Sequence, residues 1–183
     1  MFKTSEFKSP LLLAALLMLP LVQAASMGQA DYKADKIRIS DSYKADKVVC
    51  ASLAGNAKDI CAEEAKGRQA VARAELEFGY TGKPADRNKV QVAMAESIHA
   101  VSRERCDDLA GNVKDVCVKQ AKAVRTKSLA EAKMGLQVGA AMRDADDAKR
   151  NADYSVAAEK CEALSGDANT SCIADAKSRF GKI

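Results

Sequence analysis

The chain has 183 residues and a formal net charge of +4, with 29 Lys and Arg against 25 Asp and Glu. Hydrophobic residues make up 48% of it, yet only 4% of the residues are aromatic, Trp is absent and there are 3 Pro. This composition favours a helical protein over a β-sandwich, a β-barrel or a collagen-like chain. Because much of the hydrophobic fraction is alanine, which buries little surface, we expect thin helix interfaces rather than one thick core.

Residues 1–24 are predicted to be a secretory signal peptide. Lys3 and Lys8 precede an apolar run from Leu11 to Val22, and Ala24 completes a small-residue cleavage pattern. The run of about 12 residues is too short for a transmembrane helix, which needs about 20. We therefore expect residues 25–183 to form a mature, soluble protein without an integral membrane segment. In the periplasm, the thiols of this protein would pair as disulfides.

Three copies of one motif follow each other with a period of about 55 residues, which is longer than that of common solenoid repeats. The copies carry the cysteine pairs Cys50 and Cys61, Cys106 and Cys117, and Cys161 and Cys172, each pair with ten residues between its members. Midway between the cysteines lie Gly55 and Asn56, Gly111 and Asn112, and Gly166 and Asp167. We interpret each copy as two helices joined by a tight turn.

The turn residues predict how each hairpin is built. Glycine suits the left-handed conformation that ends a helix, and the Asn or Asp after it can cap the next helix. The two cysteines of a pair are equally far from the turn, so in an antiparallel hairpin they lie at one level and within reach of a disulfide. Six cysteines allow many connectivities, but this spacing selects three local bonds. Each bond should stabilise its hairpin by about 2 to 3 kcal/mol.

The expected fold class is therefore all-α, with three antiparallel hairpins, each clamped by a disulfide near its tip, over about residues 31–78, 85–134 and 140–180. The segment from Gly79 to Pro84 is the strongest interior break. Gly135 and Gly139 leave alternatives open: the chain bends there, one long helix runs from Val113 towards Ser165, or the glycines mark a face that another helix approaches. Opposite charges four residues apart, as in Glu64 and Arg68 or Asp146 and Arg150, indicate solvated helix faces.

The sequence lacks the residue groups that catalysis requires. His99 is the only histidine, and it occupies a repeat position that Tyr43 and Tyr154 fill in the other copies. We therefore interpret it as a ring on a helix flank and not as a metal ligand. A Gly-framed serine, a phosphate loop and a dinucleotide-binding glycine pattern are absent, and so are the basic and aromatic clusters of nucleic-acid sites. We expect no enzyme activity, no cofactor and no nucleic-acid partner.

Sulfur chemistry leaves two alternatives open. Facing thiols together with Met94, Met134 and Met142 could bind a soft ion such as Cu(I), although methionine more often fills helix interfaces. A thiol–disulfide redox role has less support, because reactive dithiols usually have two residues between them and these pairs have ten. Metal binding requires reduced thiols, which are uncommon in exported proteins.

The repeated Cys-x10-Cys motif, with Leu-Ala-Gly-Asn-x-Lys-Asp inside it, resembles a group of Ala- and Lys-rich exported proteins of proteobacteria, some of them labelled TolA-like or cell-envelope proteins. The resemblance covers nearly all of the mature chain and implies a periplasmic location more than an activity. Export, the repeated hairpins and the missing catalytic groups together lead us to expect a structural, binding or chaperone-like role in the cell envelope, connected with stress. The partner would be an envelope protein or polymer, or an unfolded client protein.

Overall fold

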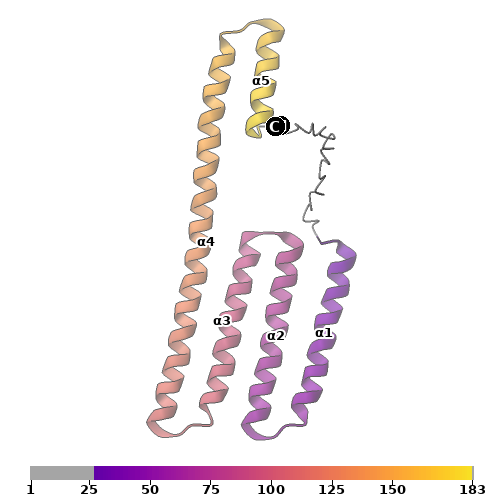
Figure 1. The fold of residues 1–183 in the computed structure, drawn as a ribbon, viewed down its shortest axis with the longest axis vertical. Helices are drawn as coiled ribbons and strands as arrows, with labels where there is room; N and C mark the ends of the chain where they lie inside the picture. Colours follow the sequence, from indigo (N-terminus) through magenta and orange to yellow (C-terminus); the bar gives the residue numbers. More distant parts are fainter. Residues whose placement is uncertain (1–26, 183) are drawn as a thin grey trace, which may run out of the picture.

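The computed structural model describes residues 27–182, which form five α-helices joined by short turns (Figure 1). The helices are α1 (Gln29–Ala51), α2 (Gly55–Thr81), α3 (Pro84–Cys106), α4 (Gly111–Glu162) and α5 (Gly166–Phe180). No strand occurs in this part of the chain, so the expected all-α class is confirmed. The expected signal peptide, residues 1–24, lies outside the described residues.

The first four helices form a single antiparallel layer (Figure 1). Within residues 27–182, each helix contacts only the helices next to it in the chain, so α1 touches α2, α2 touches α3 and α3 touches α4. Among the described helices no second layer covers α2 and α3, and the buried apolar residues are accordingly few and mostly small. They are Cys50, Ala65, Leu76, Val90, Ala95, Cys106, Ala121, Ala132, Cys161 and Ala176.

Helix α4 is uninterrupted over 52 residues, a length of about 78 Å at 1.5 Å per residue. Its first half pairs with α3 and its last turns pair with α5, so the second and third hairpins share one helix (Figure 1). Gly135 and Gly139 lie inside α4, and neither has a positive φ. Of the two backbone alternatives, a bend and one long helix, the structure has the long helix. The chain contains no proline here, and an interior glycine costs only about 1 kcal/mol.

Helices α2 and α3 approach closely at Gly67, and this contact joins the first hairpin to the second. A Cβ atom on Gly67 would lie 1.9 Å from Ser97 Oγ and 2.8 Å from Ser97 Cβ. Ala65, two residues before Gly67 on α2, and Ala95, two residues before Ser97 on α3, are both buried. Small side chains therefore allow the two backbones to pack side by side.

An ion pair crosses each interface of the layer. The pairs are Asp46 with Arg68 at 3.0 Å, Glu64 with Arg105 at 2.9 Å and Glu96 with Arg125 at 2.6 Å. Glu64 and Arg68, which are four residues apart on α2, bind residues of neighbouring helices and not each other, and Arg150 pairs with Asp147. A neighbouring helix brings an opposite charge as close as the same helix does. Such exposed pairs contribute only about 0.2 to 1 kcal/mol each, so they specify alignment more than stability.

Candidate functional site: disulfide tips and an apolar groove

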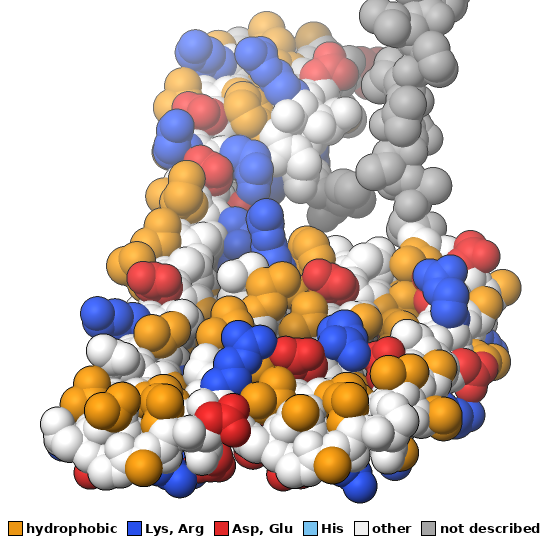
Figure 2. Space-filling view, turned by 60° about the horizontal axis from the view of Figure 1, so that its bottom comes forward, with side chains coloured by type: hydrophobic (Ala, Val, Ile, Leu, Met, Phe, Trp, Pro, Cys, Tyr) orange, Lys and Arg blue, Asp and Glu red, His pale blue; other side chains and the backbone are white. Residues whose placement is uncertain are grey.

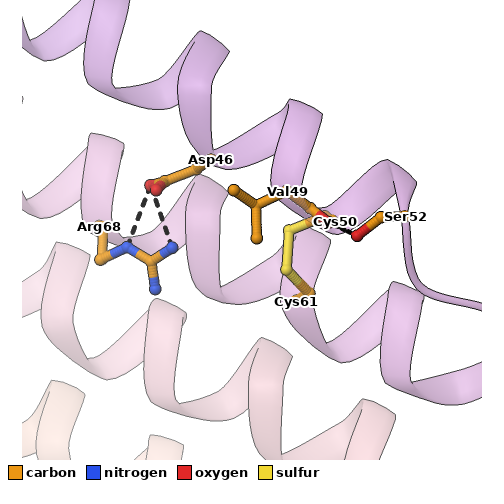
Figure 3. The surroundings of a disulfide bond; sticks show 6 residues. All are labelled: Asp46, Val49, Cys50, Ser52, Cys61 and Arg68. Atoms are coloured by element: carbon orange, nitrogen blue, oxygen red, sulfur yellow. Dashed lines mark hydrogen bonds and ion pairs between the residues drawn. A yellow bond between two sulfur atoms is a disulfide. The ribbon is translucent and has the colours of Figure 1, made fainter.

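All three predicted disulfides form, and the predicted connectivity is confirmed. They join Cys50 to Cys61, Cys106 to Cys117 and Cys161 to Cys172, with Cα–Cα distances of 5.4, 5.7 and 5.7 Å. Figure 3 shows the first disulfide between α1 and α2, near the ion pair of Asp46 and Arg68. We call the turn enclosed by each disulfide a tip. The first two tips lie at one end of the layer and the third lies at the far end of α4 (Figure 1).

The turns have the expected glycine conformation but lack the expected caps. Gly55, Gly111 and Gly166 have φ angles of +58°, +56° and +59°, in the left-handed region that favours glycine. Each of these glycines begins the second helix of its hairpin, and no side-chain hydrogen bond caps that helix. The capping role expected for Asn56, Asn112 and Asp167 was therefore wrong. The extended residue before each glycine is the N-cap, so the Asn or Asp falls two positions too late for that role.

Asn56 instead connects the first tip to the second hairpin. Its side-chain Nδ2 donates a hydrogen bond of 2.8 Å to the backbone oxygen of Glu104, near the end of α3. In the third hairpin, Asn169 Nδ2 donates to the backbone oxygen of Cys161, also at 2.8 Å. Sequence reasoning missed the Asn56 bond because its acceptor lies on another hairpin. The first and second tips are thus held together by a side-chain hydrogen bond as well as by helix packing.

The leucine shared by the three tips is exposed in each of them. Leu53, Leu109 and Leu164 keep 41%, 38% and 46% of their surface accessible. Figure 2 shows the end of the layer that carries the first two tips, where hydrophobic side chains lie among charged ones. These leucines repeat at a fixed position without contributing to a core.

The side chains proposed as metal ligands do not come together within residues 27–182. No group of three or more His, Cys, Asp or Glu side chains there could hold a metal ion, and every cysteine in this range is in a disulfide. His99 is half-buried on α3. Met94 lines the groove described below, whereas Met134 and Met142 are exposed on α4 and do not line it.

An apolar groove with a volume of about 680 Å³ runs along α3 and α4 and is also lined by residues at the end of α2. Phe78 from α2, Met94 and Ile98 from α3 and Leu136 from α4 supply its large apolar side chains. Between them lie the small residues Ala95, Ala132, Gly135 and Gly139. The missing side-chain volume at these small residues leaves the groove open, and no atom of another helix lies within 4 Å of where a Cβ on Gly135 would be. The expectation that another helix approaches these glycines is therefore not met among the described residues.

Hydrogen bonds between α3 and α4 fix the alignment of the two helices along the groove. Asn88 Nδ2 donates to the backbone oxygen of Ala132 at 2.6 Å, and Arg125 donates two bonds, of 2.7 and 2.6 Å, to the Glu96 carboxylate. These bonds from Arg125 lower the pKa of Glu96. Because α3 and α4 run antiparallel, Ile98 lies at the end of the groove nearer the second tip, and Arg87 lies at the end nearer Gly139.

The polar lining of the groove includes Arg87, Glu131 and Arg143. The guanidinium of Arg87 lies 5.8 Å from the centre of the Phe78 ring, a cation–π contact that places this charge beside the apolar wall. Within the described part of the chain, neither Arg87 nor Arg143 forms an ion pair with a carboxylate. Sequence reasoning missed the groove, because its residues come from three helices whose packing the repeat does not specify.

The turn between α2 and α3 holds this arginine end of the groove in place. Asp86, which is only 5% exposed, accepts hydrogen bonds from Thr81 Oγ1 at 2.6 Å and Lys89 Nζ at 2.7 Å. Hydrogen bonding to Lys89 and then to Thr81 lowers the pKa of the Asp86 carboxyl. This network fixes the first turn of α3, and with it the groove residues Pro84 and Arg87.

The groove and the exposed tips are two candidate recognition surfaces of the described residues. Between residues 27 and 182, no helix is both long and apolar enough to cross a bilayer. A comparison of the chain with protein families, with curated proteins and with solved structures finds no match.

Proposed function

We propose that this protein is an exported, non-enzymatic component of the cell envelope that acts by binding, with the α3–α4 groove as its contact surface. The observation that carries the proposal is the open apolar groove on a framework of disulfide-clamped helices. Ile98 is 53% exposed there and Leu136 is 36% exposed. Ligand sites in proteins are commonly concave and mostly apolar, with a small number of polar groups.

The proposed location in the periplasm has two supports. Three disulfides within one short chain are typical of an oxidising compartment. The pattern of residues 1–24 is that of a secretory signal peptide. Export also suits the architecture, because the disulfides stabilise hairpins that bury very few large side chains.

The proposed partner is another envelope component or an unfolded client protein, and a role under stress would follow from an increased supply of such clients. The single layer leaves the faces of α2 and α3 without a covering element among the described residues. Methionine in the groove adapts to ligands of different shape. These features support binding and give no support to a chemical step.

Site-specific crosslinking in envelope extracts tests the proposal. A photoreactive amino acid replaces Ile98 in the groove, and in a control variant it replaces Ile37, which is 64% exposed on α1. We expect adducts from position 98 that are absent from position 37 and that disappear when Met94→Glu is added. Equal adducts from the two positions, or none from position 98, would contradict the proposal.

Copper sequestration, the alternative suggested by the sulfur-containing residues, has less support. All the cysteines of the described chain are oxidised, and Met134 and Met142 lie outside the groove that contains Met94. Titration of the oxidised and the reduced protein with Cu(I) distinguishes the two functions. Binding tighter than micromolar by the oxidised protein would favour copper over the groove.

A further inference from the structure

The two ends of the groove differ in chemistry. Met94 and Ile98 line the end nearer the second tip, whereas Arg87 and Arg143 line the other end. The Arg143 side chain folds back along α4, since its Nη1 lies 3.5 Å from where a Cβ on Gly139 would be. Its guanidinium is therefore turned towards the groove. An apolar trough with positive charge at one end is the result.

The dimensions of the groove suit a long, narrow ligand. Its lining on α4 extends from Ser128 to Arg143, which is about 22 Å of helix at 1.5 Å per residue. The volume of about 680 Å³ lies within the range of small-molecule sites. One extended acyl chain fits this length, with its headgroup at the arginine end.

The charges favour an anionic headgroup. Arg87 and Arg143 have no carboxylate partner among residues 27–182, and Glu131 is the single acidic side chain in the lining. Guanidinium groups bind carboxylates as bidentate ion pairs, which a neutral alcohol with its single oxygen and a cationic ammonium group do not form. The arginine end is therefore complementary to a carboxylate.

The apolar end favours an acyl chain over a polypeptide. A bound peptide brings backbone N–H and C=O groups that need partners when they are buried. The Asn88 amide, which lies in the groove lining, already donates to Ala132. Towards the second tip, Met94 and Ile98 are accompanied by only two polar side chains, Gln91 and Ser128, which are too few for the donors and acceptors of an extended peptide. An acyl chain has no hydrogen-bonding groups to satisfy, and burial of its methylene groups contributes favourable binding free energy.

We propose that the groove binds a free, single-chain fatty acid, with its carboxylate at Arg87 and Arg143 and its chain along Ala95, Met94 and Ile98. The proposal rests on the groove being a binding surface, as in the proposed function, and it assigns a fatty acid of the envelope, and not an unfolded client protein, as the occupant. An acyl chain in this position would cover the apolar side chains that the layer leaves exposed.

Calorimetric titration of the folded, oxidised protein with palmitate, below the concentration at which palmitate forms micelles, tests this assignment. Hexadecanol and hexadecyltrimethylammonium serve as neutral and cationic ligands of matched chain length. We expect saturable binding of one palmitate per chain, and binding of the other two ligands that is weaker by about tenfold or more. Equal affinity for the three ligands, or palmitate binding that does not saturate, would overturn the proposal. So would binding to anionic phospholipid vesicles without binding to monomeric palmitate.

Substitutions in the groove distinguish the contribution of the headgroup to binding from that of the acyl chain. Arg143→Gln and Ile98→Gln should each weaken palmitate binding by about five- to tenfold, and Glu131→Gln should strengthen it. Arg103→Gln, an exposed position on α3 outside the groove, is the matched control and should leave affinity unchanged. Circular dichroism verifies that each variant keeps its helices. An Arg143→Gln variant that binds palmitate as tightly as the Arg103→Gln variant would contradict the assignment.

The two proposals fail in different ways. If groove-specific crosslinks to envelope components persist but palmitate does not bind, the fatty-acid assignment is wrong and the proposed function stands. If palmitate binds and position 98 yields no crosslinks in the extract, the ligand class is supported and the macromolecular partner of the proposed function is wrong.

Discussion

Single residues without bulky side chains decide where these helices can touch. At Gly67 a Cβ atom would overlap Ser97 on the neighbouring helix, whereas at Gly135 a Cβ atom would meet only open space. Both glycines lie inside helices and have ordinary helical backbones. They differ only in what lies opposite, and this makes them a matched pair for mutation.

Gly67→Ala should lower the free energy of unfolding by about 1 to 3 kcal/mol, because the Ser97 backbone would have to move away from the new methyl group. Gly135→Ala should instead raise it by about 0.5 to 1 kcal/mol, through the better helix propensity of alanine. Denaturant unfolding measures both changes. Adding Ser97→Gly to Gly67→Ala should recover much of the loss, and an unaltered stability of Gly67→Ala alone would show that α2 and α3 are less close in solution.

For single residues, the sequence predicts the bonding partners of some side chains and not of others, and the difference has a physical reason. The partners of Cys50 and Cys106 follow from spacing, because a disulfide across one hairpin depends only on distance from the turn. The partners of Asn56 and Glu64 do not, because each bonds to a helix of the next hairpin. The repeat determines the geometry within each hairpin. Contacts between hairpins depend on how the helices of different hairpins pack, which the cysteine spacing does not determine.

Among the elements, the turn from α2 to α3 is held differently from the three tips. It carries no disulfide and depends on Asp86, which accepts hydrogen bonds from Thr81 and Lys89. These bonds hold the pKa of Asp86 below its ordinary value of 3.8. A carboxyl with a lowered pKa stabilises the fold above its ordinary value, and that stabilisation is lost as the pH falls through the lower folded-state value.

Asp86→Asn should therefore loosen this turn at neutral pH and remove its response to acid. The readout is hydrogen exchange at the amides of Asp86 and Arg87, which donate to the backbone oxygen of Lys83. We expect several-fold faster exchange in the variant at pH 6, and convergence of variant and wild type when the pH falls well below 3.8. An acid response that persists in Asp86→Asn would assign the effect to another group.

The third hairpin depends on its disulfide more than the other two do. Helix α5 has 15 residues and its single buried residue is Ala176. It contacts α4 alone among the described helices. The corresponding arm of the first hairpin, α2, has 27 residues and is also packed against α3. The sequence leaves open whether α4 continues through Gly135 to meet α5.

Replacing both Cys161 and Cys172 by alanine should unfold α5 selectively, since the disulfide contributes about 3 kcal/mol to a hairpin with little other burial. Replacing Cys106 and Cys117 should lower global stability by a similar amount and leave α3 and α4 helical. Peptide-resolved hydrogen exchange compares the two variants. Full protection of residues 166–180 in the first variant would show that α5 packs independently of its clamp.

The whole molecule is extended because its helices form a layer and not a bundle. Composition predicts thin interfaces correctly, since the side chains buried between the helices are mostly alanine and cysteine. It does not predict whether three hairpins fold into one cluster or lie in a row, because Ala-lined faces allow both. The layer follows from pairing of α2 with α3 through Gly67, and the extension follows from the continuity of α4.

Small-angle scattering should therefore give a radius of gyration well above the value of about 15 Å for a compact domain of this size. The reason is that α4 alone, with 52 residues, is about 78 Å long. Scattering from the Gly135→Ala variant serves as the control and should superimpose on that of the wild type. A radius near the compact value would mean that α4 folds back on the layer in solution.

Because α4 takes part in two hairpins, its backbone links the groove mechanically to the far end of the molecule. A ligand that makes this helix rotate about its own axis between residues 128 and 143 would transmit the same rotation along its continuous hydrogen-bond ladder to α5. The groove and the third tip, which are several helical turns apart, would then rotate together.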